Sequence, residues 1–318
     1  MPNLMTVLAC PNCKRGLQPH GEVLTCPYCA ASFPVLRGIP RFVPQENYAD
    51  SFGLQWNQFA KTQLDSTIGT DRSRDRFLHE TLWDENHLAG KLVLDAGCGS
   101  GRFSEVALAL GAKLIAIDYS SAVDAASKNL NSGSLLIAQG DLAELPIPNE
   151  SLDFVYCIGV LQHTKEPGKI VAELLRCLKL GGEITLTFYE NSSWHVRLYS
   201  KYLIRPLTKR IPDRVLLTII ERSSAVWFPL TNFLFRLPSP FSRIFRFIIP
   251  IANYVEFQYA SIEAARAEAI LDTFDMLSPS YDKPIKKSEI LKWVTNSGIR
   301  VNQLEAKSNP GTMRFKKI

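Results

Sequence analysis

Short apolar runs alternate with helical patterns in the middle of the chain. The expected strands are Leu92–Asp95, Lys113–Asp118, Leu135–Gln139, Phe154–Ile158 and Glu183–Phe188. The helices expected between them are Phe103–Leu110, Ser121–Leu130 and Ile170–Leu178. Short buried strands that alternate with helices are typical of a parallel sheet in a doubly wound α/β domain.

This alternation stops at Glu190 and returns only near the C-terminus, with a helix over Ser288–Asn296. Two further strands are predicted at Ile299–Leu304 and Met313–Lys317, joined around Asn309-Pro310-Gly311 as a hairpin. The expected fold is therefore a mostly parallel, seven-stranded, Rossmann-like sheet interrupted by a helical insert.

Two Cys-x-x-Cys pairs stand near the N-terminus, Cys10 with Cys13 and Cys26 with Cys29, with twelve residues between them. This spacing is typical of a tetrahedral four-cysteine zinc site. All four ligand positions are filled, so we expect a structural rather than a catalytic Zn²⁺. In so small a unit the metal would replace a hydrophobic core.

These patterns divide the chain into five parts. We expect a zinc-ribbon module at 1–44, a helical linker region at 45–90 and a cofactor-binding core at 91–190. A helical substrate cap would follow at 191–284, and the closing helix and strands at 285–318. A helix over Arg72–Leu82 is predicted within the linker region.

Composition places the chain among ordinary globular proteins, since 46% of its 318 residues are apolar and 21% are charged. The N-terminus has neither the cationic start nor the apolar run of a signal peptide. No segment reaches the roughly 18 apolar residues of a membrane span. We therefore expect a cytoplasmic protein, in which cysteines stay reduced.

The positive charge is concentrated in the stretch Asn191–Glu256, which has ten Lys/Arg against three Asp/Glu and eleven aromatic residues. Val196, Tyr199, Leu203 and Leu207 follow a helical spacing there. One interpretation is a lid that contacts the inner membrane face or grips an amphiphilic, phosphate-bearing substrate. The other is a helical cap whose apolar side packs into the core.

A glycine-rich loop, Asp95-Ala96-Gly97-Cys98-Gly99-Ser100-Gly101, connects the first strand of the core to its helix. Glycines let the backbone approach a ligand, and the helix N-terminus offers free N–H groups. Arg102 follows Gly101, so the G-x-G-x-x-G spacing of a dinucleotide site is not met.

Acidic residues follow three successive strands, since Asp95, Asp118 and Asp141 are spaced 23 residues apart. In a parallel sheet all three lie at the C-terminal edge, where such folds bind ligands. A carboxylate after the second strand suits a ribose diol, and one after the third an exocyclic amine. Asp95 could help to hold an ammonium group.

The core resembles the class I S-adenosylmethionine (SAM) methyltransferases, in the branch of the ubiquinone/menaquinone and small-molecule methyltransferases. The motifs that carry the resemblance are Leu94–Gly101, Ala116–Ser120, Gly140–Leu142, Leu152–Tyr156 with Val160–Thr164, and Leu178–Glu183. It implies that Gly97, Gly99 and Gly101 line the methionine end of SAM. Asp118, with Tyr119 beside it, would hold the ribose, Asp141 and Leu142 the adenine, and Gly159–His163 would face the sulfonium.

Candidates for a general base come from three places. His163 follows the fourth strand, and a cofactor-pocket role is its alternative. His195 lies just past the fifth strand, and Tyr281 lies near Pro284. Asp272–Tyr281 resembles a stretch of methyltransferases that share an N-terminal motif of the type seen at Phe52–Asn57, which indicates family rather than role.

The N-terminal module resembles the small zinc-ribbon proteins that activate RNA and protein methyltransferases. We therefore expect methyl transfer to a small-molecule, lipid-linked or sugar-linked acceptor, with a hydroxyl as the favoured acceptor. One alternative is an rRNA or tRNA base methyltransferase whose zinc module binds RNA, although no Asn-Pro-Pro-Tyr motif is present. The other is a SAM-binding scaffold without catalysis.

Overall fold

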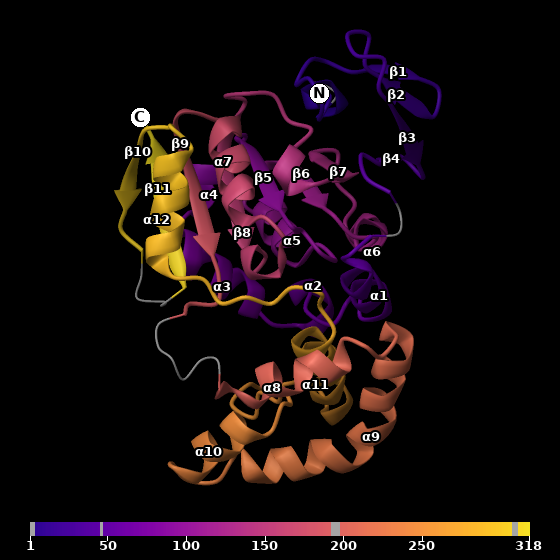
Figure 1. Ribbon diagram of the computed structural model, residues 1–318, viewed down its shortest axis with the longest axis vertical. Coiled ribbons are helices and arrows are strands. Elements are labelled where there is room, and N and C mark those ends of the chain that lie inside the picture. Colours follow the sequence, from indigo (N-terminus) through magenta and orange to yellow (C-terminus); the bar gives the residue numbers. More distant parts are fainter. Residues whose placement is uncertain (1–3, 45–46, 192–197, 307–310) are drawn as a thin grey trace.

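The computed structural model describes residues 4–44, 47–191, 198–306 and 311–318. Figure 1 shows the N-terminal strands at one end of the molecule, the helices of the insert at the other, and the large sheet between them. Among the described residues, no helix combines the length and the apolar character needed to cross a bilayer.

The large sheet has seven strands in the order β10-β11-β9-β8-β5-β6-β7. Its strands are β5 (Leu92–Ala96), β6 (Lys113–Asp118), β7 (Leu135–Gln139), β8 (Leu152–Ile158), β9 (Leu178–Thr187), β10 (Val301–Leu304) and β11 (Thr312–Lys317). The strands β5 to β9 pair in parallel, whereas β11 and β10 add an antiparallel edge. The predicted mostly parallel, doubly wound sheet is confirmed, while part of the predicted 309–311 turn lies outside the described residues.

Helices cover both faces of this sheet because successive residues of its strands point to opposite sides. Leu94 of β5 packs in a cluster with α7 and α12, whereas Val93 packs with α3 and α5. The helices around the sheet are α3 (Arg72–Thr81), α4 (Glu85–Leu88), α5 (Arg102–Ala109), α6 (Val123–Asn129), α7 (Pro167–Cys177) and α12 (Lys287–Asn296).

The N-terminal module begins with η1 (Leu4–Val7) and continues as a four-stranded antiparallel sheet in the order β1-β2-β3-β4. Its strands are β1 (Gln18–His20), β2 (Val23–Thr25), β3 (Ser32–Leu36) and β4 (Ile39–Pro40). The module packs on the large sheet, since Leu8 and Leu24 belong to the same buried cluster as Leu94. The sequence did not reveal this attachment.

The chain leaves the module along the edge strand β7. The Phe42 amide donates to the Gln139 carbonyl oxygen at 2.8 Å. The buried Arg41 guanidinium donates to Gln139 Oε1 at 3.0 Å and pairs with Asp124 at 2.7 Å. The module therefore covers an edge of the sheet that lies next to the predicted cofactor residues.

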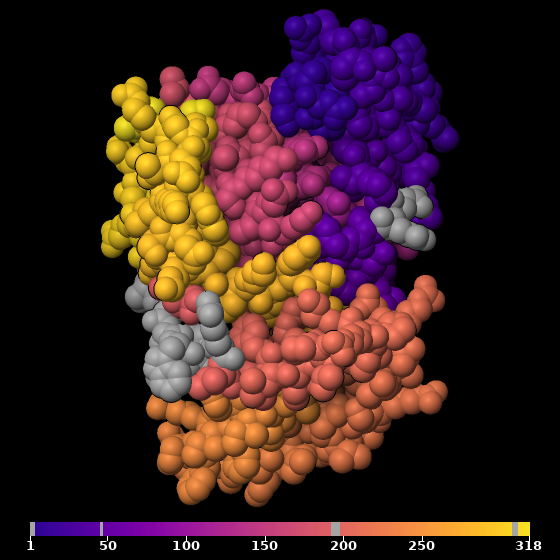
Figure 2. All heavy atoms as spheres, in the orientation of Figure 1, coloured from indigo at the N-terminus to yellow at the C-terminus, as the bar shows by residue number. Residues whose placement is uncertain are grey.

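The insert consists of α8 (Ser200–Thr208), α9 (Asp213–Leu234), α10 (Phe241–Ile248) and α11 (Ile262–Leu277). In Figure 2 its orange surface forms the end of the molecule opposite the indigo N-terminal module. Helix α11 packs against α8 and α9, and also against α1 (Asp50–Gln58). A short helix, α2 (Asp65–Ile68), follows α1.

The apolar side chains that were predicted at helical spacing in the insert face outward where they are described. Leu203 and Leu207 on α8 are each 65% exposed, and Tyr199 just before it is 43% exposed. These side chains do not form the core of a cap, which corrects that interpretation. Val196 lies outside the described residues.

Candidate functional site

A cavity of about 360 Å³ opens at the C-terminal edge of the parallel strands. Ligand pockets typically hold about 300–1,000 Å³. Its walls come from the loops after β5, β6, β7 and β8, from α1, and from α11 of the insert. The position agrees with the rule that open α/β sheets bind ligands beyond the carboxyl ends of their strands.

The glycine loop forms one wall of this cavity. Gly97 and Gly99 line it, and both have positive φ angles, 89° and 53°. A Cβ atom on Gly97 would collide with the Val160 side chain, so the loop can take this path only with glycine there. Gly101 also has a positive φ, 98°, and caps α5, but it is not among the residues that line the cavity.

Asp118 lies at the end of β6 and lines the cavity. Its Oδ2 accepts from the Gly99 amide at 2.9 Å, and its Oδ1 accepts from the Ser120 amide and hydroxyl at 2.8 and 2.7 Å. Burial raises the pKa of this carboxyl. An ionised carboxylate has about four acceptor sites, so the fixed Asp118 side chain retains capacity for a ligand hydroxyl.

Asp141 and Leu142 lie on the same wall, beyond β7. The Ala143 amide donates to Asp141 Oδ1 at 2.7 Å, and burial raises the pKa of Asp141. Tyr119 also lines the cavity, and its ring stacks on Tyr48 with centroids 4.7 Å apart. The sequence did not indicate Tyr48, which follows the N-terminal module directly.

Asp95 is placed differently from the other two acids. Its side chain is buried, and Oδ2 accepts from the Ser104 hydroxyl at 2.6 Å. Burial raises its pKa to about 7, and the residue is not among those that line the cavity. Its predicted contact with an ammonium group stays a prediction.

His163 and Gly159 follow β8 and line the cavity. The His163 Nδ1 lies 3.1 Å from the backbone oxygen of Tyr281. A carbonyl oxygen only accepts, so Nδ1 donates, and the neutral ring keeps Nε2 as an acceptor. Phe52 and Tyr189 pack edge-on against the ring, with centroids 5.2 and 5.6 Å away.

Of the other two predicted base candidates, only Tyr281 belongs to the described part of the chain. Tyr281 contributes its backbone oxygen to His163, and its ring packs edge-on against Tyr48 at 5.4 Å. It is not among the lining residues. His195 lies outside the described residues, so its predicted role stays a prediction.

Several lining residues were not predicted as site residues. They come from α1, from the segment after it and from the insert: Gln55, Trp56, Gln63, Tyr254, Asp272, Asp275 and Met276. The motifs at Phe52–Asn57 and Asp272–Tyr281 were the signals in the sequence, but only the fold brings them together.

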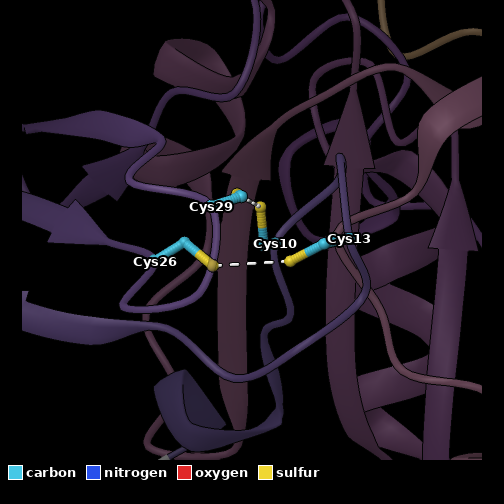
Figure 3. Close-up of side chains that lie close together, drawn as sticks. All are labelled: Cys10, Cys13, Cys26 and Cys29. Carbon is cyan, nitrogen blue, oxygen red and sulfur yellow. Dashed lines mark hydrogen bonds between the residues drawn. The ribbon is translucent and has the colours of Figure 1, made fainter.

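The four N-terminal cysteines form one cluster (Figure 3), and their sulfur atoms all lie within 4.8 Å of one another. Cys10 and Cys29 have sulfur atoms 3.5 Å apart, as do Cys13 and Cys26. Zn–S bonds of about 2.3 Å in a tetrahedron require sulfur atoms roughly 3.8 Å apart. The donor set and its spacing fit a zinc ion.

Comparison with known proteins identifies the class of the core. Residues 94–186 match the model of the family described as Methyltransferase domain. The core of the chain is therefore similar to a methyltransferase domain, as the motifs predicted.

Curated relatives match over less than half of the chain. The ubiquinone biosynthesis O-methyltransferase of Schizosaccharomyces pombe is 31% identical over 144 residues, 42% of this chain and 52% of that protein. The enzyme of the same name from Burkholderia lata is 34% identical over 137 residues, 40% of this chain and 58% of that protein. The chain thus spans little more than half the length of these relatives.

Solved structures align over more of the chain at lower identity. A chain of the complex between the Haloferax volcanii Trm112 methyltransferase activator and a methyltransferase is 12% identical, with a TM-score of 0.47, and the alignment covers 86% of this chain and 97% of that one. A SAM-dependent methyltransferase from Mesorhizobium loti is 12% identical, with a TM-score of 0.42, covering 73% of this chain and 92% of that one.

Proposed function

We propose that the protein is a SAM-dependent methyltransferase that acts on a hydroxyl group of a small-molecule, lipid-linked or sugar-linked acceptor. The observation that supports this most strongly is the single cavity wall formed by the Gly97–Gly99 turn, Asp118 and Asp141. The O-methyltransferase names of the relatives support an oxygen acceptor.

Each part of this wall would contact a different part of SAM. The Gly97–Gly99 backbone would hold the amino-acid end of SAM, Asp118 the ribose hydroxyls, and Asp141 with Leu142 the adenine. Bound SAM supplies a methyl group already activated by its sulfonium. The protein then has to orient the acceptor in line with that methyl group and exclude water.

His163 would take the proton that the acceptor hydroxyl loses as its oxygen forms the new bond to carbon. Its Nδ1 donates to Tyr281, which leaves Nε2 free to accept. General bases typically contribute about 10²–10⁴-fold to rate. The four cysteines would hold one structural Zn²⁺ and give the N-terminal module its fold.

Titration of SAM into the purified, zinc-loaded protein tests the cofactor assignment. We expect calorimetric binding in the micromolar range for the wild type and no binding of NADH. Asp118→Ala should weaken SAM binding by roughly 10- to 100-fold, because it removes charge-assisted bonds worth about 1.5–3 kcal/mol. Asp71→Ala, an exposed acid on the surface, serves as the matched control. No SAM binding by the wild type would refute the proposed function.

We also propose that the insert rests on an anionic membrane surface. Val226 and Phe233, seven residues apart on α9, are 72% and 65% exposed, and Phe241 on α10 is 58% exposed. Residues 198–256 contain nine Lys/Arg against three Asp/Glu. Amphipathic helices with basic and aromatic residues bind in the interfacial plane of such membranes.

Vesicle sedimentation tests this contact. The wild type should sediment with phosphatidylglycerol vesicles more than with phosphatidylcholine vesicles, and salt should weaken the binding, since each basic residue near the surface contributes about 1 kcal/mol. The double variant Val226→Asp/Phe233→Asp should remain in the supernatant, while the control Leu291→Asp, on α12, should still sediment. Equal sedimentation of all three proteins would refute the contact.

A further inference from the structure

The cavity is also lined by residues outside the cofactor-binding loops, to which nothing above assigns a ligand. We define this acceptor subsite by five lining residues: Gln55, Gln63, Tyr254, Asp272 and Asp275. Gln55 lies on α1, Gln63 in the segment before α2, and both aspartates on α11. Segments about 200 residues apart thus supply a single wall.

Hydrogen bonds hold the two carboxylates of this subsite in place. Gln63 Nε2 donates to Asp272 Oδ1 at 3.3 Å, and the Tyr254 hydroxyl bonds the same carboxylate. Gln55 Nε2 donates to Asp275 Oδ1 at 3.4 Å. Since a carboxylate offers about four acceptor sites, both aspartates keep the capacity to accept from a ligand.

Gln55 provides an independent sign of a missing donor. Its side chain is only 1% exposed, and within the described part of the chain its Oε1 has no hydrogen-bond partner. A buried acceptor without a hydrogen-bond partner costs about 1–3 kcal/mol, so native proteins rarely leave such an acceptor unpaired. A hydroxyl donated by a ligand would satisfy it.

Acids outnumber cations around the cavity. Arg76 and Arg102 line it together with Asp272 and Asp275, and Asp118 and Asp141 line it as well. The Arg102 guanidinium donates to Gln63 Oε1 at 2.9 Å, and Gln63 in turn donates to Asp272, so Gln63 connects the arginine to the aspartate. Burial, with a contribution from Asp275, raises the pKa of Asp272 to about 7. The excess of acids disfavours an anionic ligand, and the unused acceptors favour one that carries hydroxyl groups.

We propose that this subsite binds the methyl acceptor through neighbouring hydroxyl groups, which donate to Asp272, Asp275 and Gln55. The inference rests on the proposed methyltransferase function and specifies its substrate class. Asp272 and Asp275 are binding residues in it, whereas the proton still passes to His163. Phenolic rings and sugar rings both carry such hydroxyl groups, and experiment separates the two sources.

The test uses the full-length, zinc-loaded protein saturated with S-adenosylhomocysteine. Catechol represents the phenolic ring and methyl α-D-glucopyranoside the sugar ring, while 1,2-dimethoxybenzene lacks the donors. Binding is measured by saturation-transfer NMR and titration. The variants are Asp272→Asn and Asp275→Asn, with Glu263→Gln as the matched control, because Glu263 is an exposed acid on the same helix.

We expect the wild type and Glu263→Gln to bind one of the two hydroxylated probes and not the dimethoxy compound. Asp272→Asn and Asp275→Asn should each weaken the binding of that probe by about tenfold or more, while the affinity for S-adenosylhomocysteine changes less than twofold. Loss of S-adenosylhomocysteine affinity in Asp272→Asn would assign the carboxylate to the cofactor and overturn the inference.

Failure of both probes to bind a wild type that still binds SAM would overturn the substrate class and leave the methyltransferase proposal intact. A wild type that does not bind SAM would refute the proposed function itself. The two failures are therefore distinguishable, since SAM binding is measured independently of the acceptor probes.

Discussion

Removal of zinc is expected to unfold the N-terminal module. Structural zinc contributes an apparent free energy of about 10–16 kcal/mol in small zinc-binding peptides, and this module has little core of its own. Cys13→Ser should abolish stoichiometric zinc and lower the melting temperature. It should also weaken SAM binding, because residues that follow the module contact β7 and the cavity: Arg41 bonds Gln139 of β7, and Asn47 and Tyr48 contact Tyr119.

Metal analysis, thermal unfolding and SAM titration measure the three effects on the same samples. Cys177→Ala is the matched control, since this cysteine is buried outside the cluster and should leave one zinc per chain. A Cys13→Ser protein that keeps its zinc, or loses it with an unchanged melting temperature, would contradict a structural metal. Unchanged SAM affinity after zinc loss would contradict the coupling to the cofactor pocket.

Replacement of His163 by alanine is expected to reduce turnover by about 10²–10³-fold and to change SAM affinity by less than twofold. The physical reason is the free Nε2 in the cavity, which would remove the proton of the acceptor hydroxyl. Turnover is measured with the acceptor that the wild type methylates best, and SAM affinity by calorimetry. His79→Ala, at an exposed position of α3, serves as the control.

A second variant separates proton transfer from positioning. His163→Asn keeps an amide donor where Nδ1 donates to the Tyr281 carbonyl oxygen but lacks the accepting Nε2. If His163 is the general base, the turnover of His163→Asn should be as slow as that of His163→Ala. Recovery of turnover in His163→Asn would make His163 a positioning residue, and equal losses of turnover and SAM affinity would make it a cofactor contact.

The strand-and-helix order could be predicted because each element has a local cause. The runs Lys113–Asp118 and Leu135–Gln139 are strands over the predicted residues, since a short apolar run between polar turns has few other buried conformations. The spacing of the cysteines and of Asp118 and Asp141 likewise follows from local units, the zinc knuckle and the βα repeat. The equal spacing of the three aspartates did not determine where their side chains lie. Asp95 accepts a hydrogen bond from Ser104 and does not line the cavity.

The sequence by itself thus determined the class of fold, the cysteine cluster and the loops after β5, β6, β7 and β8 that line part of the cavity, all of which depend on neighbours along the chain. Only the tertiary structure decided which face of the insert is exposed and which side chains complete the cavity. The hydrogen bond from Gln63 to Asp272 spans 209 residues, and that from Arg41 to Gln139 spans 98. Periodicity cannot encode such contacts, because they depend on how separately formed elements pack against one another.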